Sequence, residues 1–246
     1  MSLSGFGDIM SLKHLLFTHK PLEELTMTVI APETTQERFS ARLKESTKHV
    51  HDNAEHSTFM EDLMGGSLNT EAYLRLINQY VHIYEALEAV SEHYRAEPSP
   101  ITEPFTHPGL DRAEYIRADI RALGQEGDID APLPATAEYV ERIRATINSP
   151  ERYLAHHYLR YLGDLSGGQA VAALVTRHYG IPAEALSMYR FTELPKPKVF
   201  KDGYRELLDN APMTDEQREA LIDECIEGFR INASLFAQLG RKVAEA

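Results

Sequence analysis

The stretch from Tyr158 to Gln169 has the sequence Tyr-Leu-Arg-Tyr-Leu-Gly-Asp-Leu-Ser-Gly-Gly-Gln, which places three glycines within six residues. It lies inside a longer segment that we predict to be one helix. Ser149 and Pro150 are typical of a helix start, and Gly180 and Pro182 of a helix end. Each glycine inside a helix costs roughly 0.5–1 kcal/mol relative to alanine. A helix that keeps three of them therefore needs a compensating close neighbour.

Three interpretations of the glycine run are open. The glycines mark a contact with another helix, a break into a loop, or a flat ligand that lies on the glycine face. Gly163 and Gly167 are four residues apart and therefore share one side of the helix, with Gly168 one position round and Asp164 beside them. A bend at glycine would also let the helix curve over a large planar group.

Apolar periodicity predicts helices in the rest of the chain as well. After residue 70, large apolar and aromatic side chains recur every three or four residues, as on one face of an amphipathic helix. This stripe consists of Tyr73, Leu76, Ile77, Tyr80, Val81, Tyr84 and Leu87. Further helices are predicted over about 34–54, 111–123, 136–147, 150–179 and 199–209, and from 214 onward. Capping boxes are predicted at Thr34 with Glu37 and at Thr214 with Gln217. Because no strand alternation or βαβ pattern is found, the predicted fold class is all-α.

Composition excludes several classes of protein. The 246 residues carry a net charge of −13, so a basic face for phosphates is not expected and nucleic acid is excluded as a main partner. Cys225 is the only cysteine, which excludes an internal disulfide or a cysteine-ligated metal and favours a reducing, cytoplasmic location. No membrane anchor is expected, because no apolar run approaches about 18 residues. No secretion signal is expected either, because the short apolar patch at 15–17 lacks a basic segment before a long apolar core and a small-residue cleavage site. Residues 1–33 lack sustained periodicity, and we predict a mobile N-terminal extension there, followed by one folded domain over 34–246.

In its glycine run the sequence resembles the heme oxygenase family. Residues 43–60 are similar to the family's proximal segment, and residues 199–205 and 229–236 to its two later heme-contact segments. The similarity covers about residues 36 to 241 and is strongest to bacterial, soluble members. It implies a single-domain helical fold in which heme lies between a proximal helix and a glycine-kinked distal helix.

The resemblance also implies a reaction. Heme, as both substrate and cofactor, would be converted to biliverdin, carbon monoxide and ferrous iron with O2 and external electrons. The electrons would come from a separate reductase or ferredoxin, because the chain has no flavin or nicotinamide fingerprint: its glycine run lies in a helix and does not follow a strand. A basic patch near the heme propionates would dock an acidic electron donor. A monomer is favoured.

The resemblance assigns the iron ligand to His51, since neutral imidazole is a common axial ligand of heme. Glu55 lies one helical turn on, where it can accept a hydrogen bond from the other imidazole nitrogen directly or through water. His156 and His157 are rival ligands because they precede the glycine run, and His56 is a weaker rival. The resemblance disfavours the first two because it places their helix on the distal side, where no protein ligand should hold the iron.

Basic and aromatic residues complete the expected heme pocket. Cations near the propionates would fix the rotation of heme and so select the carbon that reacts. These cations are Lys44, Lys201 and Arg205. The residues expected to line or support the pocket are Tyr158, Phe229, Asn232 and Phe236. Aromatic residues at this spacing are nevertheless more often core residues.

Proton delivery is expected on the distal side of the heme. In the family that the chain resembles, the residue corresponding to Asp164 acts through ordered water. Tyr158 and Arg160 would extend that water network. The glycines that would let heme approach the backbone are Gly163, Gly167 and Gly168.

Two functions other than an enzyme stay open. The chain is alternatively a non-catalytic heme carrier or sensor that keeps the fold and His51, or a helical interaction module that handles another cofactor or none. Asp164 favours the enzyme over the carrier, because a carrier does not need a distal carboxylate.

Overall fold

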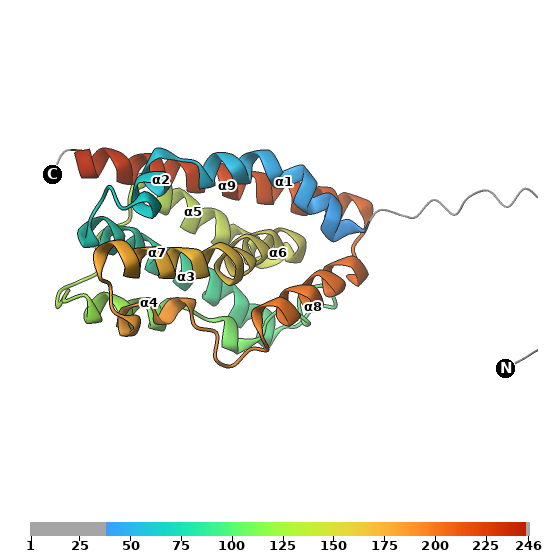
Figure 1. Ribbon diagram of the computed structural model, residues 1–246. Helices are drawn as coiled ribbons and strands as arrows, with labels where there is room; N and C mark the ends of the chain where they lie inside the picture. Colours follow the sequence, from blue (N-terminus) through green and yellow to red (C-terminus); the bar gives the residue numbers. More distant parts are fainter. Residues whose placement is uncertain (1–37, 245–246) are drawn as a thin grey trace, which may run out of the picture. The chain divides into compact units, whose positions relative to one another are not determined.

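The computed structural model describes residues 38–244, which form helices and connecting loops without a strand (Figure 1). The predicted all-α fold class is therefore confirmed. The predicted extension over 1–33 and the capping box of Thr34 and Glu37 lie outside the described residues. None of the described helices is long and apolar enough to cross a membrane.

The described residues contain both long and short helices. The α-helices are α1 (Phe39–Glu55), α2 (Thr58–Gly65), α3 (Thr70–Ala96), α4 (Ala113–Ala122), α5 (Pro134–Arg144), α6 (Pro150–His157), α7 (Gln169–Tyr179), α8 (Pro197–Asn210) and α9 (Asp215–Ala244). The short 3-10 helices are η1 (Pro108–Leu110), η2 (Ala145–Asn148), η5 (Ala183–Ala185) and η6 (Ser187–Tyr189). The π-helical segments are η3 (Tyr158–Leu162) and η4 (Asp164–Gly168).

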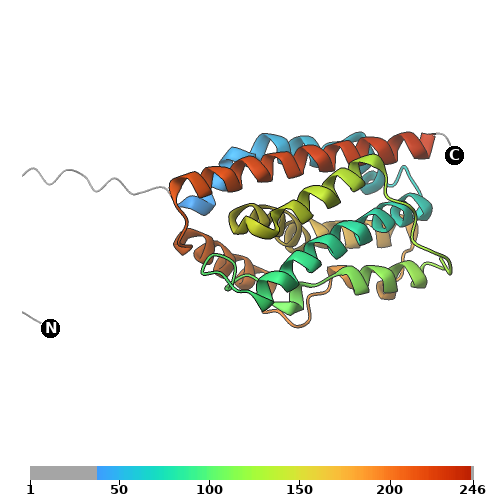
Figure 2. The same ribbon diagram turned by 180° about the vertical axis from the view of Figure 1, so that it is seen from behind.

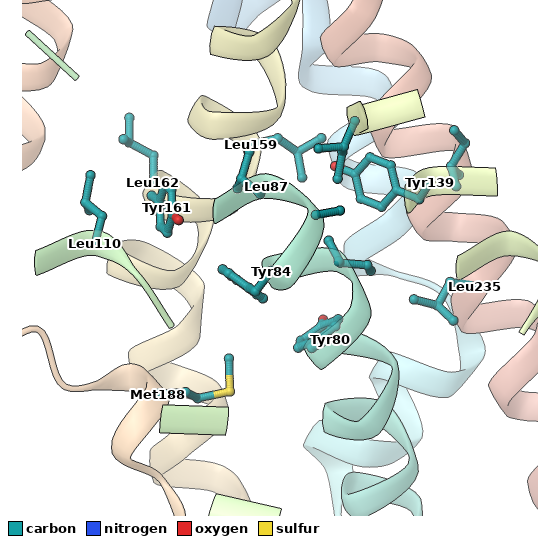
Figure 3. Close-up of a cluster of buried hydrophobic side chains, with 14 of the residues drawn as sticks. Tyr80, Tyr84, Leu87, Leu110, Tyr139, Leu159, Tyr161, Leu162, Met188 and Leu235 are labelled. Atoms are coloured by element: carbon teal, nitrogen blue, oxygen red, sulfur yellow. The ribbon is translucent and has the colours of Figure 1, made fainter. Parts of the chain in front are cut away.

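Helix α3 lies at the centre of the packing, between α4 and α5 (Figure 2). It begins at Asn69, whose side chain accepts a hydrogen bond from the Ala72 N–H at 2.9 Å and so satisfies a backbone donor of the first turn. The predicted stripe from Tyr73 to Leu87 is buried along its whole length. Figure 3 shows Tyr80 and Tyr84 one turn apart on α3 within this cluster.

Helix α2 is not among the predicted helices. It has eight residues and buries only Phe59 and Leu63, which is too short a pattern for periodicity to reveal. The helix ends at Gly66, which has a left-handed φ of 83°. A Cβ at Gly66 would lie 2.7 Å from Nδ1 of His178, so packing against α7 requires glycine there as well.

Helix α9 begins as predicted. The Thr214 N–H donates to Gln217 Oε1 at 3.0 Å, and the Gln217 N–H donates to Thr214 Oγ1 at 3.2 Å, which is a capping box. From there α9 packs along α1, α5 and α6. It therefore borders both α1, which carries His51, and the start of the helix that leads into the glycine run.

The helix predicted over 150–179 forms without interruption from α6 through η3 and η4 to α7, and we call it the glycine helix. Its middle is π-helical, a geometry that is rare and is frequent at functional sites. Ser149 is the N-cap residue as predicted, although its side chain makes no capping hydrogen bond. Pro150 starts the helix, since its missing N–H costs nothing at the first helical position. Gly180, with φ 67°, ends it as predicted.

Candidate functional site

His51 is a half-exposed residue of α1 whose Nδ1 atom faces two carboxylates. The side chain is 52% exposed, and Nδ1 lies 3.4 Å from Asp52 Oδ1 and 3.6 Å from Glu55 Oε2. An imidazole that donates its Nδ1 proton to a carboxylate presents Nε2 as a lone pair, which is the form that binds a metal. His51 therefore has both the access and the orienting neighbours that an axial ligand needs.

Gly163 and Gly167 leave one face of the glycine helix open. Both are exposed, and a Cβ on either would meet no atom of the described residues within 4 Å outside the helix's own nearby backbone. Gly168 is different, because its Cβ would lie 2.8 Å from Cδ1 of Tyr189. A protein contact thus accounts for glycine at position 168, whereas the first two glycines expose bare backbone.

Helix α9 borders both His51 and the glycine helix. The Phe229 ring lies edge-on to the His51 imidazole, with a centroid distance of 5.4 Å and an interplanar angle of 77°. The neighbouring Gly228 faces the other way, since its Cβ would lie 2.9 Å from Cδ1 of Leu159 in η3. Consecutive residues of one helix therefore contact the imidazole-bearing helix and the glycine helix.

Helix α8 joins the same two helices at a second place. Asp209 Oδ1 accepts a hydrogen bond from the Ser40 N–H of α1 at 2.8 Å. Lys201 Nζ donates to Ser166 Oγ at 2.9 Å, within the π-helical segment that carries the open glycines. A cation therefore stands beside the bare backbone, and its predicted role at a heme propionate stays a prediction.

The other predicted cations lie on exposed surface. Arg205 Nη1 forms an ion pair with Asp202 Oδ1 at 3.1 Å, one helical turn away on α8. Lys44 is exposed on α1, on the same helix as His51. Their predicted roles at the propionates stay predictions.

Asp164 lies in a buried polar network between the glycine helix and α3. Its Oδ2 accepts a hydrogen bond from the hydroxyl of Tyr84, and that hydroxyl accepts one from Arg160 Nε at 3.3 Å. The Arg160 guanidinium lies 4.3 Å from the centre of the Tyr80 ring. Burial raises the pKa of Asp164, and the positive charge of Arg160 opposes that rise. The network thus holds a carboxyl group whose protonation is tuned by its surroundings.

Two predicted pocket residues of α9 have protein partners in the structure. Asn232 is buried, and its Oδ1 lies 3.5 Å from Arg160 Nη1, so it supports the arginine of the Asp164 network. Phe236 is 8% exposed and stacks on Phe59 of α2 at a centroid distance of 6.4 Å. Phe236 therefore packs as a core residue, which is the commoner role for aromatic residues at this spacing.

Tyr158 is part-buried and contacts α8. Its ring centroid lies 6.4 Å from that of Tyr204. This contact points to a role in packing against α8, and the predicted link between Tyr158 and the water network of Asp164 stays a prediction.

The rival histidines on the glycine helix are buried and held by other partners. His156 Nε2 lies 2.9 Å from Glu224 Oε1, and His157 Nδ1 lies 2.9 Å from the Tyr204 hydroxyl. Both are at most 1% exposed. His56 is exposed beside Glu61. Neither buried histidine is therefore as accessible to a ligand as His51 is.

Sequence reasoning did not assign two residues of this site. Tyr84 belongs to the predicted apolar stripe, which also contains Tyr73 and Tyr80, so its hydroxyl gave no signal that singled it out. Asp52 follows His51 directly in the sequence, but which of Asp52 and Glu55 lies nearer the imidazole depends on side-chain rotamers. No sequence pattern carries that information.

Comparison with known proteins covers almost all of the described residues. The family model for heme oxygenase matches residues 37–238. The heme oxygenase of Rhodella violacea is 33% identical over 202 residues, which cover 80% of this chain and 85% of that protein. Heme oxygenase 1 of Rattus norvegicus is 34% identical over 212 residues, which cover 84% of this chain and 73% of that protein.

Solved structures give the same result for the fold. The crystal structure of heme oxygenase-1 from Synechocystis sp. PCC6803 in complex with heme matches with a TM-score of 0.79 and 26% identity, over 85% of this chain and 95% of that one. Heme oxygenase from Leptospira interrogans matches with a TM-score of 0.77 and 30% identity, over 82% of this chain and 99% of that one. The family match runs through α1, the glycine helix and most of α9. The chain therefore belongs to the heme oxygenase family, the enzymes that cleave heme oxidatively to biliverdin.

Proposed function

We propose that this enzyme binds heme between α1 and the open backbone of Gly163 and Gly167, with His51 Nε2 as the iron ligand. The observation that carries this assignment is the position of α9. Phe229 contacts the imidazole while Gly228 faces Leu159, one turn before Gly163 on the glycine helix, so α9 brings His51 near the turn that leads into the bare backbone. The residues present fit the group, because heme needs an accessible nitrogen on one face and a surface without side chains on the other.

Asp52 and Glu55 orient the proposed ligand. A carboxylate that accepts the Nδ1 proton fixes the tautomer and the ring orientation of a metal-binding histidine. Asp52 also accepts a hydrogen bond from Lys48 Nζ at 2.5 Å, so its carboxylate is itself held in place. The two acidic neighbours thus share the role that the sequence analysis assigned to Glu55.

Lys201, Arg205 and Lys44 are proposed to bind the heme propionates. The support is strongest for Lys201, whose ammonium group already stands beside Ser166 and the open glycines. Charge-assisted hydrogen bonds from these cations would fix the rotation of heme in its pocket. If heme is bound, a fixed rotation would decide which carbon of its ring is placed to react and so which product isomer forms.

Asp164 is proposed to supply, through ordered water, the protons that ring opening consumes. A buried carboxyl group with a raised pKa keeps its proton nearer to neutral pH than an exposed aspartate does. Tyr84 holds one carboxylate oxygen, Oδ2, which leaves Oδ1 to exchange protons with water. Arg160 of the glycine helix and Asn232 of α9 position Tyr84 and Asp164.

The reaction is proposed to use O2 and electrons from a separate reductase or ferredoxin, and to release carbon monoxide and ferrous iron. The cations near the proposed propionate edge would attract an acidic electron donor. A monomeric state and a cytoplasmic location, the latter inferred from the single cysteine, stay predictions.

The test is turnover by the purified protein. Heme, a reductant and O2 are added in the presence of catalase, and absorption is followed for loss of the heme band and growth of a bilin band. His51→Ala is expected to abolish most bilin formation, because the iron loses its ligand.

The matched control is His56→Ala, which removes an exposed histidine just beyond the end of α1. It should behave like the parent protein. Bilin formation at the parental rate by His51→Ala would show that the ligand is misassigned. A persistent heme band without bilin in the parent protein would identify a carrier instead of an enzyme.

A further inference from the structure

Helix α8 carries two of the proposed propionate cations and is weakly anchored. Lys201 and Arg205 belong to it, yet Tyr204 and Leu208 are the only buried residues among its 14. It lies at the periphery beside α6 in both views (Figures 1 and 2). Elements with few buried contacts are the ones that shift or open most readily. The contacts that hold α8 therefore decide where these cations stand.

The outer face of α8 is only loosely covered by the described residues. A groove of about 530 Å³ lies between this face and the loop that contains Pro104 and Phe105. Val199 and Leu207 line the groove and are 61% and 41% exposed. A Cβ at Gly203, between them on the same face, would meet no atom of the described residues within 4 Å outside the helix's own nearby backbone. Packing on this side therefore does little to hold α8 in place.

The inner face of α8 is fixed to the glycine helix by a buried hydrogen bond. The Tyr204 hydroxyl lies 2.9 Å from His157 Nδ1, and the two rings stack at a centroid distance of 5.7 Å with an interplanar angle of 14°. Both residues are at most 2% exposed. Phe105 packs edge-on against the Tyr204 ring at a centroid distance of 4.9 Å. His157 thus lies where the glycine helix, α8 and the loop of Phe105 meet.

The surroundings of His157 determine its protonation and its tautomer. Burial lowers the pKa of His157 to about 3, and the positive charge of Arg95 adds to this, so the imidazole is neutral at pH 7. A hydrogen bond with the Phe105 backbone opposes the lowering, which means that the imidazole donates it to the carbonyl oxygen. Nε2 therefore carries the proton, and Nδ1 accepts from the Tyr204 hydroxyl.

The other polar links of α8 do not replace this hydrogen bond. Asp209 Oδ1 accepts from the Ser40 N–H at 2.8 Å, but that link leads to α1. Lys201 Nζ donates to Ser166 Oγ at 2.9 Å, but that link uses a cation that we assign to a propionate. The hydrogen bond of Tyr204 is therefore the polar link to the glycine helix, among the described residues, that does not depend on the proposed heme-binding cations.

We propose that His157 is a positioning residue: through Tyr204 it fixes α8 against the glycine helix and so sets where Lys201 and Arg205 hold the heme propionates. The inference rests on the proposed function and adds a residue that helps to determine the product isomer. Tyr204 directly precedes Arg205 and lies one helical turn from Lys201, so a displacement of Tyr204 moves both cations. His157 acts only through Tyr204.

The first test measures the rotational orientation of bound heme before any turnover. Different orientations give separate heme methyl resonances in proton NMR spectra of the ferric complex, and the ratio of these resonances is measured. Tyr204→Phe keeps the stacked ring and removes only the hydroxyl. It should change the ratio by about two- to tenfold, the size of one hydrogen bond. An unchanged ratio would overturn the inference.

The matched control is Tyr94→Phe. It also removes one buried tyrosine hydroxyl, which on α3 donates to the Thr146 carbonyl at 3.0 Å. This variant should lose a comparable amount of stability and keep the parental ratio of heme orientations. A change in the ratio as large as that of Tyr204→Phe would show a general effect of lost stability and would overturn the inference.

Two variants at position 157 separate the hydrogen bond from packing. Asparagine and leucine have nearly the same shape, but only the asparagine amide oxygen can accept from Tyr204. His157→Leu should change the ratio of heme orientations as Tyr204→Phe does, whereas His157→Asn should keep it nearer the parental value. Equal ratios in these two variants would show that His157 only fills space, which would contradict the proposed role.

Turnover then shows whether the orientation reaches the product. In Tyr204→Phe the proportions of the bilin isomers, measured by chromatography, should shift together with the ratio of heme orientations. Parental isomer proportions despite a changed orientation would refute the link to the product. If the parent protein forms no bilin, the proposed function fails, while the ratio of heme orientations still decides whether His157 positions the cations.

Discussion

Replacing Gly167 with alanine should raise the stability of the ligand-free enzyme and weaken its binding of heme. The new Cβ would meet no atom of the described residues within 4 Å outside the helix's own nearby backbone, so it creates no clash in the ligand-free protein. Alanine in place of an interior helical glycine stabilises by about 0.5–1 kcal/mol. For a domain of this size, 1 kcal/mol moves Tm by about 2–4 °C.

The same methyl group lies on the face that we assign to heme. A group inserted into a fitted contact typically costs about 1–3 kcal/mol, which corresponds to a loss of roughly 5- to 150-fold in heme affinity. The two effects have opposite signs because they report different states of the protein. Thermal unfolding followed by circular dichroism measures the first, and titration with heme followed by absorption measures the second.

Gly168→Ala is the matched control one residue further on. Its Cβ would lie 2.8 Å from Cδ1 of Tyr189, so the neighbouring ring must move. We expect this variant to lose about 1–3 kcal/mol of stability. If Gly167→Ala also lowers Tm, protein and not an open surface covers that face. If it raises Tm and leaves heme affinity unchanged, heme does not lie on Gly167.

Three further predictions follow from the site and from the buried carboxylate of Glu224. Asp164→Asn should lower the rate of bilin formation about a hundredfold, the size of the effect of a lost general acid. It should not lower stability at pH 7, because the raised pKa of Asp164 means that the ionised carboxylate destabilises the fold. Bilin formation at the parental rate would contradict the proton-delivery role. Lys201→Ala should change the proportions of the biliverdin isomers relative to the parent, measured by chromatography of the products, and an unchanged isomer pattern would remove Lys201 from the propionate site. Glu224→Gln should flatten the acid dependence of stability. The folded pKa of about 2 lies below the ordinary 4.5, so the contribution of Glu224 is present above about pH 4.5 and is lost as the pH falls toward 2. Urea unfolding at pH 7 and pH 3 measures this, and equal losses of stability in parent and variant would refute it.

Periodicity and end signals predicted most of the fold. The α3 stripe, the long glycine helix with its stop at Gly180, and the capping box at Thr214 all depend on local chemistry that the sequence carries directly. Helix α2 was not predicted because its eight residues bury only two large apolar side chains. Ser149 occupies the N-cap position as predicted, and Pro150 starts the helix without a capping hydrogen bond to the Ser149 side chain.

The sequence was less informative about how the site is connected. Glycine spacing predicted one open face, but the structure separates Gly168, which packs on Tyr189, from the exposed Gly163 and Gly167. The hydrogen bond from Tyr84 to Asp164 joins residues that are 80 positions apart. Tertiary contacts of this kind depend on how α3 packs against the glycine helix, which no local pattern encodes.

The central claim is that heme lies between the imidazole of His51 and the bare backbone of the glycine helix. A crystal structure of the heme-loaded enzyme tests it most directly. It should show iron bound by His51 Nε2, with the porphyrin against Gly163 and Gly167. Iron held by another residue, with the His51 side chain in solvent and α1 packed directly on the glycine helix, would contradict the claim.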